Sequence, residues 1–174
     1  MAHAFLAAAA RDHPTATAVV QFSLSDDGAA DGAERTIDYA ALHEWSRAVA
    51  RRLPKSAAFH APSPLRRQLV AISVDGGALL PLALAACWMA GLAVLPLDAS
   101  EPSARIAALL NDAQPYLVLA LPSQLGRIHA AQEEQQAGQA SVAGVIDFQA
   151  LAEAADPSKH HADNAAELGA DPDS

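Results

Sequence analysis

The sequence from residue 68 to residue 120 alternates short, continuous apolar runs with stretches of helical spacing. The apolar runs lack regular polar positions, which indicates strands that are buried on both faces of a sheet. Helical stretches between such strands are typical of a parallel sheet covered by helices. We therefore predict an α/β fold, a mostly parallel sheet with helices on both faces. Its expected strands are 68–74, 92–97 and 116–120, and its expected helices are 78–90 and 103–112.

Weaker patterns flank this region. Before it, the spacing predicts a helix at 4–11, a hairpin of strands 18–24 and 34–37, and a further helix that Asp38 caps and Pro54 ends. After Pro122 the patterns are less regular. There we expect one more strand at 142–148, a short helix at 151–155, and a polar run at 132–136 on a helix surface or loop.

The segment from Gly76 to Leu97 contains no charged residue and would pass for a membrane span on hydropathy alone. However, Pro81 suits the first turn of a helix, Gly91 suits a C-terminal cap, and Pro96 ends an apolar strand. A helix, a turn and a strand would leave backbone polar groups unpaired in lipid, so we expect no membrane span. The apolar start at 5–10 lacks a basic leading region, which favours a first helix in a cytoplasmic protein over a targeting signal.

Length and composition bound the domain organisation. A chain of 174 residues predicts about one domain, at roughly 100–200 residues per domain. Hydrophobic residues make up 52% of the chain, but 44 of them are alanines, which bury little area and leave enough for one modest core. We predict a folded body over residues 1–155 and a disordered acidic tail over residues 156–174.

The charge balance excludes several classes of partner. The formal net charge is −9, from 20 acidic and 11 basic residues, and the only basic clusters are the pairs at 51–52 and 66–67. Nucleic-acid binding requires a concentrated positive patch, so we expect no nucleic-acid partner. The same acidity argues against docking on an anionic membrane. The single cysteine excludes a disulfide scaffold.

Two features of the strand–helix region resemble chemical sites. Gly76 and Gly77 lie between a strand and a helix, where dinucleotide-binding folds hold pyrophosphate, but the spaced glycine pattern is absent and a tight turn is favoured. Cys87 lies in the apolar helix 78–90, which favours a core position over a catalytic thiol. We expect this helix to pack against strand 68–74 in the middle of the sheet, through Leu80, Leu84 and Cys87 or Trp88.

The remaining candidates for chemistry are few. His160 and His161 could bind a metal with Asp163, but a mobile tail would supply no fixed geometry. The only lysines are Lys55 and Lys159, both in expected loops, and the sequence contains no nucleophile elbow, zinc-protease motif or P-loop. We therefore predict no catalytic, cofactor-binding or metal-binding residue in this chain.

The order of several motifs resembles the opening of the adenylate-forming enzymes, which include acyl-CoA synthetases, nonribosomal peptide synthetase adenylation domains and luciferases. His13-Pro14 precedes the strand around 17–20, and the stretch 36–42 leads into a helix. The strongest match is Trp88–Asp98, which is similar to a core motif of that superfamily. With its continuation, the structural family motif falls on Gly91, Pro96, Leu97, Asp98, Pro102 and Arg105.

The match departs from the family pattern at three positions. Met89 stands where lysine is common, Ala99 where proline follows the aspartate, and Glu101 where an aromatic residue is usual. The start at residues 3–6 and the stretch 91–102 resemble more narrowly the eukaryotic acyl-activating enzymes related to aminoadipate-semialdehyde or β-alanine activation. The overall resemblance covers residues 3–155 in order.

The resemblance implies an enzyme that joins a carboxylic or amino acid to AMP, with ATP and Mg²⁺ as cofactors, and passes the acyl group to CoA or a phosphopantetheine carrier. In this family a Thr/Ser/Gly-rich phosphate loop and a C-terminal lysine supply the chemistry, and here no threonine follows Thr36. We therefore expect a scaffold fragment that is inactive alone and binds neither ATP nor Mg²⁺. Its expected partner is the remainder of a ligase or a full-length paralogue. The alternatives are a non-catalytic interaction module and a small nucleotide-binding domain that uses Gly76 and Gly77.

Overall fold

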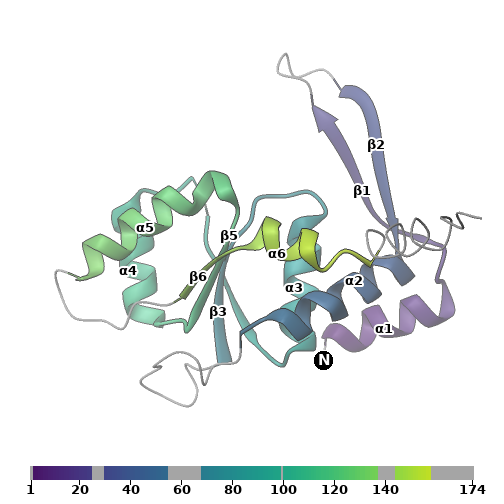
Figure 1. Cartoon of the computed structure of the whole chain (residues 1–174), viewed down its shortest axis with the longest axis horizontal. Coiled ribbons are helices and arrows are strands. Elements are labelled where there is room, and N and C mark those ends of the chain that lie inside the picture. The colour runs from purple at the N-terminus through teal and green to yellow at the C-terminus, as the bar shows by residue number, and fades with distance from the viewer. Residues whose placement is uncertain (1, 25–29, 55–67, 99, 137–143, 158–174) are drawn as a thin grey trace, which may run out of the picture.

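The computed structural model describes residues 2–24, 30–54, 68–98, 100–136 and 144–157. Its centre is a parallel sheet of strands β3 (Leu69–Ser73), β4 (Ala93–Pro96), β5 (Leu117–Ala120) and β6 (Gly144–Asp147). These strands lie in the order β4-β3-β5-β6, and every neighbouring pair is parallel. Figure 1 shows helices packed on both sides of this sheet. The predicted α/β fold is confirmed.

Alternate residues of the strands enter two separate cores. Val70 and Ile72 of β3 point into the larger core, where they meet helices α2 (Tyr39–Arg52), α3 (Leu79–Met89) and α6 (Phe148–Ala154). Ala71, between them, points to the opposite face, which α4 (Ser103–Ala113) and α5 (Pro122–Gln136) cover. This two-residue alternation explains the unbroken apolar runs in the sequence, because both faces of each central strand are buried.

A two-stranded antiparallel hairpin lies outside this sheet. It pairs β1 (Thr17–Leu24) with β2 (Ala30–Asp38), as predicted, and Figure 1 shows it projecting from the body. It follows helix α1 (Ala2–Asp12), which packs on α2 and α3. At the end of β2 the Asp38 carboxylate accepts a hydrogen bond of 2.7 Å from the Ala41 backbone N–H, which confirms the predicted N-cap of α2.

Strand β4 is less buried than expected. The sequence predicts a strand covered on both sides, but β4 lies at the edge of the sheet, and its end residues Ala93 and Pro96 are exposed. An apolar run in a sequence predicts a hydrophobic strand, but it does not predict whether that strand lies at the centre or at the edge of the sheet. An edge position also tolerates Pro96, because a central strand would need the backbone N–H that proline lacks.

The buried face of α3 also differs from the prediction. Leu82 and Cys87 are fully buried, whereas Leu80 and Leu84 are only half-buried against the same core. Trp88, an expected core residue, is 37% exposed. The helix itself carries apolar residues on every face, so its sequence has no polar stripe that would mark the face turned to solvent.

Two C-terminal segments extend further than expected. The polar run at 132–136 belongs to the long helix α5, which buries Ile128 and Ala131. The indole N–H of Trp45 donates a 2.8 Å hydrogen bond to the Ala152 carbonyl and joins α2 to the last helix. Asp156, placed by prediction in the tail, is only 8% exposed, and the remainder of that tail, 158–174, lies outside the described residues.

A glycine cap separates α3 from β4. Gly91 has φ +75°, its N–H donates to the Trp88 carbonyl, and the Leu92 N–H donates to the Cys87 carbonyl at 2.9 Å. These two bonds form a Schellman motif, which satisfies carbonyl groups at the end of the helix. The C-terminal cap predicted at Gly91 is confirmed.

We expect Gly91→Ala to lower the free energy of unfolding by about 1 kcal/mol, because a side chain is disfavoured at positive φ. A Cβ at Gly91 would meet nothing within 4 Å, so the cost comes from the backbone conformation alone. Gly126 in α5 is the matched control, since a Cβ there also meets open space. Gly126→Ala is expected to raise stability by about 0.5–1 kcal/mol. Denaturant unfolding of both variants would contradict the assignment if the two changes had the same sign.

Candidate functional site

The four parallel strands all end on the same side of the sheet, which we call the carboxyl edge. The chain moves from β3 to β4 on one side and then crosses to β5 on the other, so the direction of the strand order reverses at β3. In open α/β sheets, ligands bind outside the carboxyl ends of the strands at such a reversal. The loops that follow β3, β4 and β5 therefore form the candidate site.

A buried polar pair fills the space between β3 and β5 at this edge. The Ser73 hydroxyl donates a 2.6 Å hydrogen bond to the Gln124 side-chain oxygen, and the Leu121 N–H donates to the Ser73 carbonyl. The Gln124 amide nitrogen has no hydrogen-bond partner among the described residues. Sequence reasoning missed this pair, although Ser73 is the only polar residue of strand β3.

The loop after β3 is a tight turn closed by a side chain from the hairpin. Gly76 and Gly77 have φ +45° and +60°. The Gln21 amide lies 3.4 Å from the position of a Cβ at Gly77, and its oxygen accepts a 3.3 Å hydrogen bond from the Ala78 N–H. One donor at the start of α3, the Ala78 N–H, is thus used within the protein, which favours the turn over the nucleotide-binding alternative.

A hollow of about 350 Å³ lies between the segments that follow β3 and β4. Val74, Asp75, Leu97, Asp98 and Ser100 line it. The Asp98 carboxylate accepts hydrogen bonds of 2.7 Å from the Ser100 hydroxyl and 2.8 Å from the Ser100 N–H, and these bonds lower the pKa of Asp98. The hollow is therefore acidic. Within the described ranges, no three His, Cys, Asp or Glu side chains gather closely enough to hold a metal ion.

The family-motif residues are spread along one connection. Gly91 caps α3 at the far end of β4, and Pro96 ends that strand. The buried Leu97 donates its N–H to the Ile72 carbonyl at 2.8 Å and reaches the acidic hollow with Asp98. Pro102 is the N-cap of α4, and Arg105 lies exposed in its first turn. Only Leu97 and Asp98 of the six reach the hollow.

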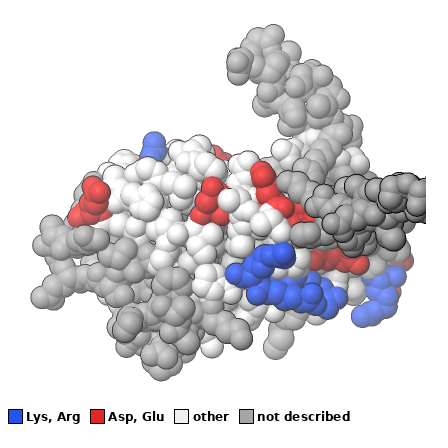
Figure 2. All heavy atoms as spheres, viewed as in Figure 1, with Lys and Arg blue, Asp and Glu red and all other residues white. Residues whose placement is uncertain are grey.

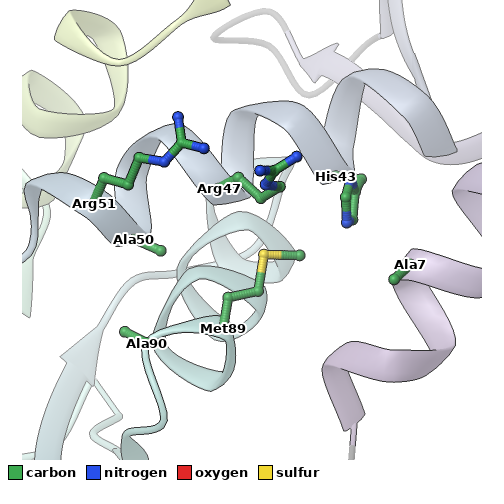
Figure 3. A pocket seen from close by; sticks show the side chains of 7 residues that line it. All are labelled: Ala7, His43, Arg47, Ala50, Arg51, Met89 and Ala90. Carbon is green, nitrogen blue, oxygen red and sulfur yellow. The ribbon is translucent and has the colours of Figure 1, made fainter.

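A second hollow, of about 370 Å³, lies on the helical side of the molecule, between α1, α2 and α3. Figure 2 shows a basic patch over α2, the helix that carries Arg47, Arg51 and Arg52. Burial, followed by the positive charge of Arg47, lowers the pKa of His43 at this hollow. Its lining is Ala7, His43, Arg47, Ala50, Arg51, Met89 and Ala90 (Figure 3).

The buried thiol is confirmed as a core group. Cys87 has no exposed surface, and burial raises its pKa to about 12, so the thiol stays protonated at neutral pH. None of the helices in the described residues is long and apolar enough to cross a membrane. The remaining candidates lie outside the described residues: Lys55, the arginines at 66–67, Lys159, His160, His161 and Asp163.

Comparison with known proteins identifies one family. The model of the family described as AMP-binding enzyme matches residues 6–174. The isonitrile lipopeptide synthase of Streptomyces coeruleorubidus is 40% identical over 85 residues, which are 49% of this chain and 5% of that protein. The N-(5-amino-5-carboxypentanoyl)-L-cysteinyl-D-valine synthase of Amycolatopsis lactamdurans is 36% identical over 84 residues, which are 48% and 2% of the two chains.

Solved structures share the fold at low sequence identity. A fatty acyl-adenylate ligase from L. pneumophila, in complex with acyl adenylate and pyrophosphate, has a TM-score of 0.61 at 16% identity, over 86% of this chain and 23% of that one. VinN in complex with 3-methylaspartate has a TM-score of 0.65 at 15% identity, over 91% and 38%. The chain thus spans well under half the length of these relatives. The narrower resemblance to eukaryotic acyl-activating enzymes has no support among them.

Proposed function

Because this chain belongs to the AMP-binding enzyme family, we propose that it is the N-terminal part of a ligase that activates a carboxylic or amino acid as its adenylate. The observation that carries the proposal is the family match over residues 6–174, together with a described fold that resembles a part of longer ligases. The remainder of the ligase is the proposed partner, and the proposed location is the cytoplasm. CoA or a phosphopantetheine carrier is the proposed acyl acceptor.

The described residues support a scaffold role rather than a catalytic one. Reaction at the α-phosphate of ATP requires positive charge or hydrogen-bond donors around the phosphates. The hollow at the carboxyl edge offers Asp75 and Asp98 instead, and no lysine or arginine is among its described lining residues. A phosphate group would be repelled there, so this hollow does not fit ATP. At the start of α3 the Ala78 N–H is already bonded to Gln21.

The carboxyl edge of the sheet nevertheless has a role in this proposal, as a support for groups from other segments. The Ser73–Gln124 bond and the Gln21 contact fix the loops after β3 and β5 in one arrangement. Groups that a longer chain adds beside this edge would meet a rigid surface, which is the condition for placing catalytic side chains accurately. The chain would thus supply support for a site completed by other segments.

We expect the isolated chain to show no exchange of pyrophosphate into ATP with any carboxylic or amino acid. The measurement uses protein free of host ligases, a panel of acids, and a complete adenylating ligase as the positive control. Exchange above the buffer control would overturn the scaffold assignment. The ligase assignment has a separate test, the reading frame downstream of this sequence. A longer product that lacks a Gly/Ser/Thr-rich loop followed by lysine, and that also shows no exchange, would overturn it.

A further inference from the structure

We propose that the hollow between α1, α2 and α3 binds a small organic oxyanion, a carboxylate or phosphate group carried on a short apolar stem. This inference goes beyond the proposed ligase function and does not depend on it. The hollow lies on the helical side of the molecule, away from the carboxyl edge of the sheet, and Figure 3 shows its lining side chains on three helices.

One wall of the hollow is a stripe of nitrogen-bearing side chains on α2. His43, Arg47 and Arg51 follow one another at intervals of four residues, which places them on the same face of the helix. The two guanidinium groups are therefore about one helical turn apart. Each presents a planar fork of N–H donors that matches the two oxygens of a carboxylate or phosphate.

The floor of the hollow is apolar and made of small side chains. Ala7 comes from α1, Ala50 from α2, and Met89 and Ala90 from the end of α3. Three methyl groups leave a concavity where larger side chains would close the gap between the helices. A volume of about 370 Å³ falls within the range of small-molecule sites, roughly 300–1,000 Å³. The floor thus suits the apolar stem of the ligand.

The charge at this place is unusual for the chain. The protein carries a net charge of −9, yet none of the described residues that line the hollow carries a carboxylate. Within the part of the chain that the structure describes, neither Arg47 nor Arg51 has a hydrogen bond or an ion pair. The carboxylate of Glu44 raises the pKa of His43, but burial and the charge of Arg47 outweigh that effect. Two guanidinium groups with no partner among the described residues, beside an apolar floor, are complementary to an anion with an apolar stem.

The test is calorimetric titration of the full chain with butyl phosphate, butanoate and inorganic phosphate. We expect butyl phosphate to bind at least tenfold more tightly than inorganic phosphate, because about two buried methylene groups give roughly that factor. Comparison of butyl phosphate with butanoate decides which head group the arginines prefer. In parallel, NMR titration of His43 should show its pKa rising when the anion binds, since a nearby negative charge favours the imidazolium.

Variants separate a built site from general attraction. Arg47→Gln and Arg51→Gln should each weaken butyl phosphate binding about tenfold or more, while melting temperatures stay unchanged because both side chains are exposed. Arg52→Gln is the matched control, with the same charge change one residue outside the lining, and should leave binding within about twofold. Ala50→Leu should fill the floor and remove the preference for the butyl group.

Two results would overturn the proposal. One is the absence of saturable binding of either organic anion at roughly 10 mM, which is weaker than specific small-ligand sites. The other is equal weakening by Arg52→Gln and Arg47→Gln with no preference for the butyl stem, which would mean that the helix attracts anions only through its net charge.

Discussion

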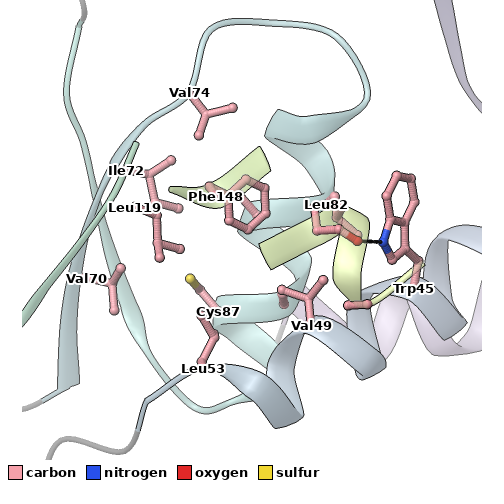
Figure 4. Packing of buried hydrophobic residues seen from close by; sticks show 14 of the residues in the cluster. Trp45, Val49, Leu53, Val70, Ile72, Val74, Leu82, Cys87, Leu119 and Phe148 are labelled. Atoms are coloured by element: carbon pink, nitrogen blue, oxygen red, sulfur yellow. Dashed lines mark hydrogen bonds between the residues drawn. The ribbon is translucent and has the colours of Figure 1, made fainter. Parts of the chain in front are cut away.

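Replacing Leu82 with aspartate is expected to abolish folding of this chain. Leu82 is fully buried in the larger core, in the cluster that also holds Phe148 and the strand residues Val70 and Ile72 (Figure 4). The described cluster around this position consists of hydrophobic side chains, so the carboxylate would be buried among apolar groups, ionised or protonated, at high cost. Together with the lost burial of the leucine, that cost is comparable to the roughly 5–15 kcal/mol that separates folded from unfolded domains.

A graded series on the same helix tests this placement. Leu84→Asp should cause a smaller loss because Leu84 is half-buried, and Trp88→Asp the smallest because Trp88 is 37% exposed. Circular dichroism during heating, together with the soluble yield, gives the order of the three. If Trp88→Asp unfolded the protein while Leu82→Asp melted like the wild type, the orientation of α3 would be wrong.

Phe148→Ala is expected to lower the free energy of unfolding by about 3–5 kcal/mol, the usual cost of emptying an aromatic site in a core. Phe148 is fully buried and is the first residue of α6, directly after the last strand of the sheet. Phe5 provides the same substitution at a position that is 79% exposed, so Phe5→Ala should change stability by less than about 0.5 kcal/mol. Urea unfolding measures both, and similar losses would contradict the assignment of Phe148 to the core.

The periodicity of the sequence predicts most of this fold for a physical reason. Both faces of β3 and β5 are buried, so their runs are almost wholly apolar. Asp38 at the start of α2 and Gly91 at the end of α3 are residues that cap helices locally. Such signals act within a few residues and survive in the sequence. Packing between distant segments places β4 at the edge of the sheet and leaves Trp88 exposed. Local sequence patterns therefore do not predict these two features.

The candidate sites divide in the same way. The turn at Gly76 and Gly77 could be recognised from sequence because positive φ selects glycine. The Ser73–Gln124 bond joins residues 51 positions apart, and only the crossover connection brings them together. The basic hollow needs α1, α2 and α3 to pack, and its floor consists mostly of alanines that no motif distinguishes. Sites assembled from several elements therefore cannot be predicted from sequence patterns, even where each element is predicted correctly.

Ribosomes release β3 before any other strand of the parallel sheet. Its neighbours β4 and β5 follow in sequence on opposite sides, so one edge of β3 stays open until Leu117–Ala120 has been synthesised. At about 5–20 residues per second this interval lasts several seconds. Throughout it, unpaired backbone groups flanked by Val70, Ala71 and Ile72 are available to neighbouring nascent chains. Pairing between nascent chains through β3 is accordingly a hazard during synthesis, and it ends when β5 takes its place beside β3.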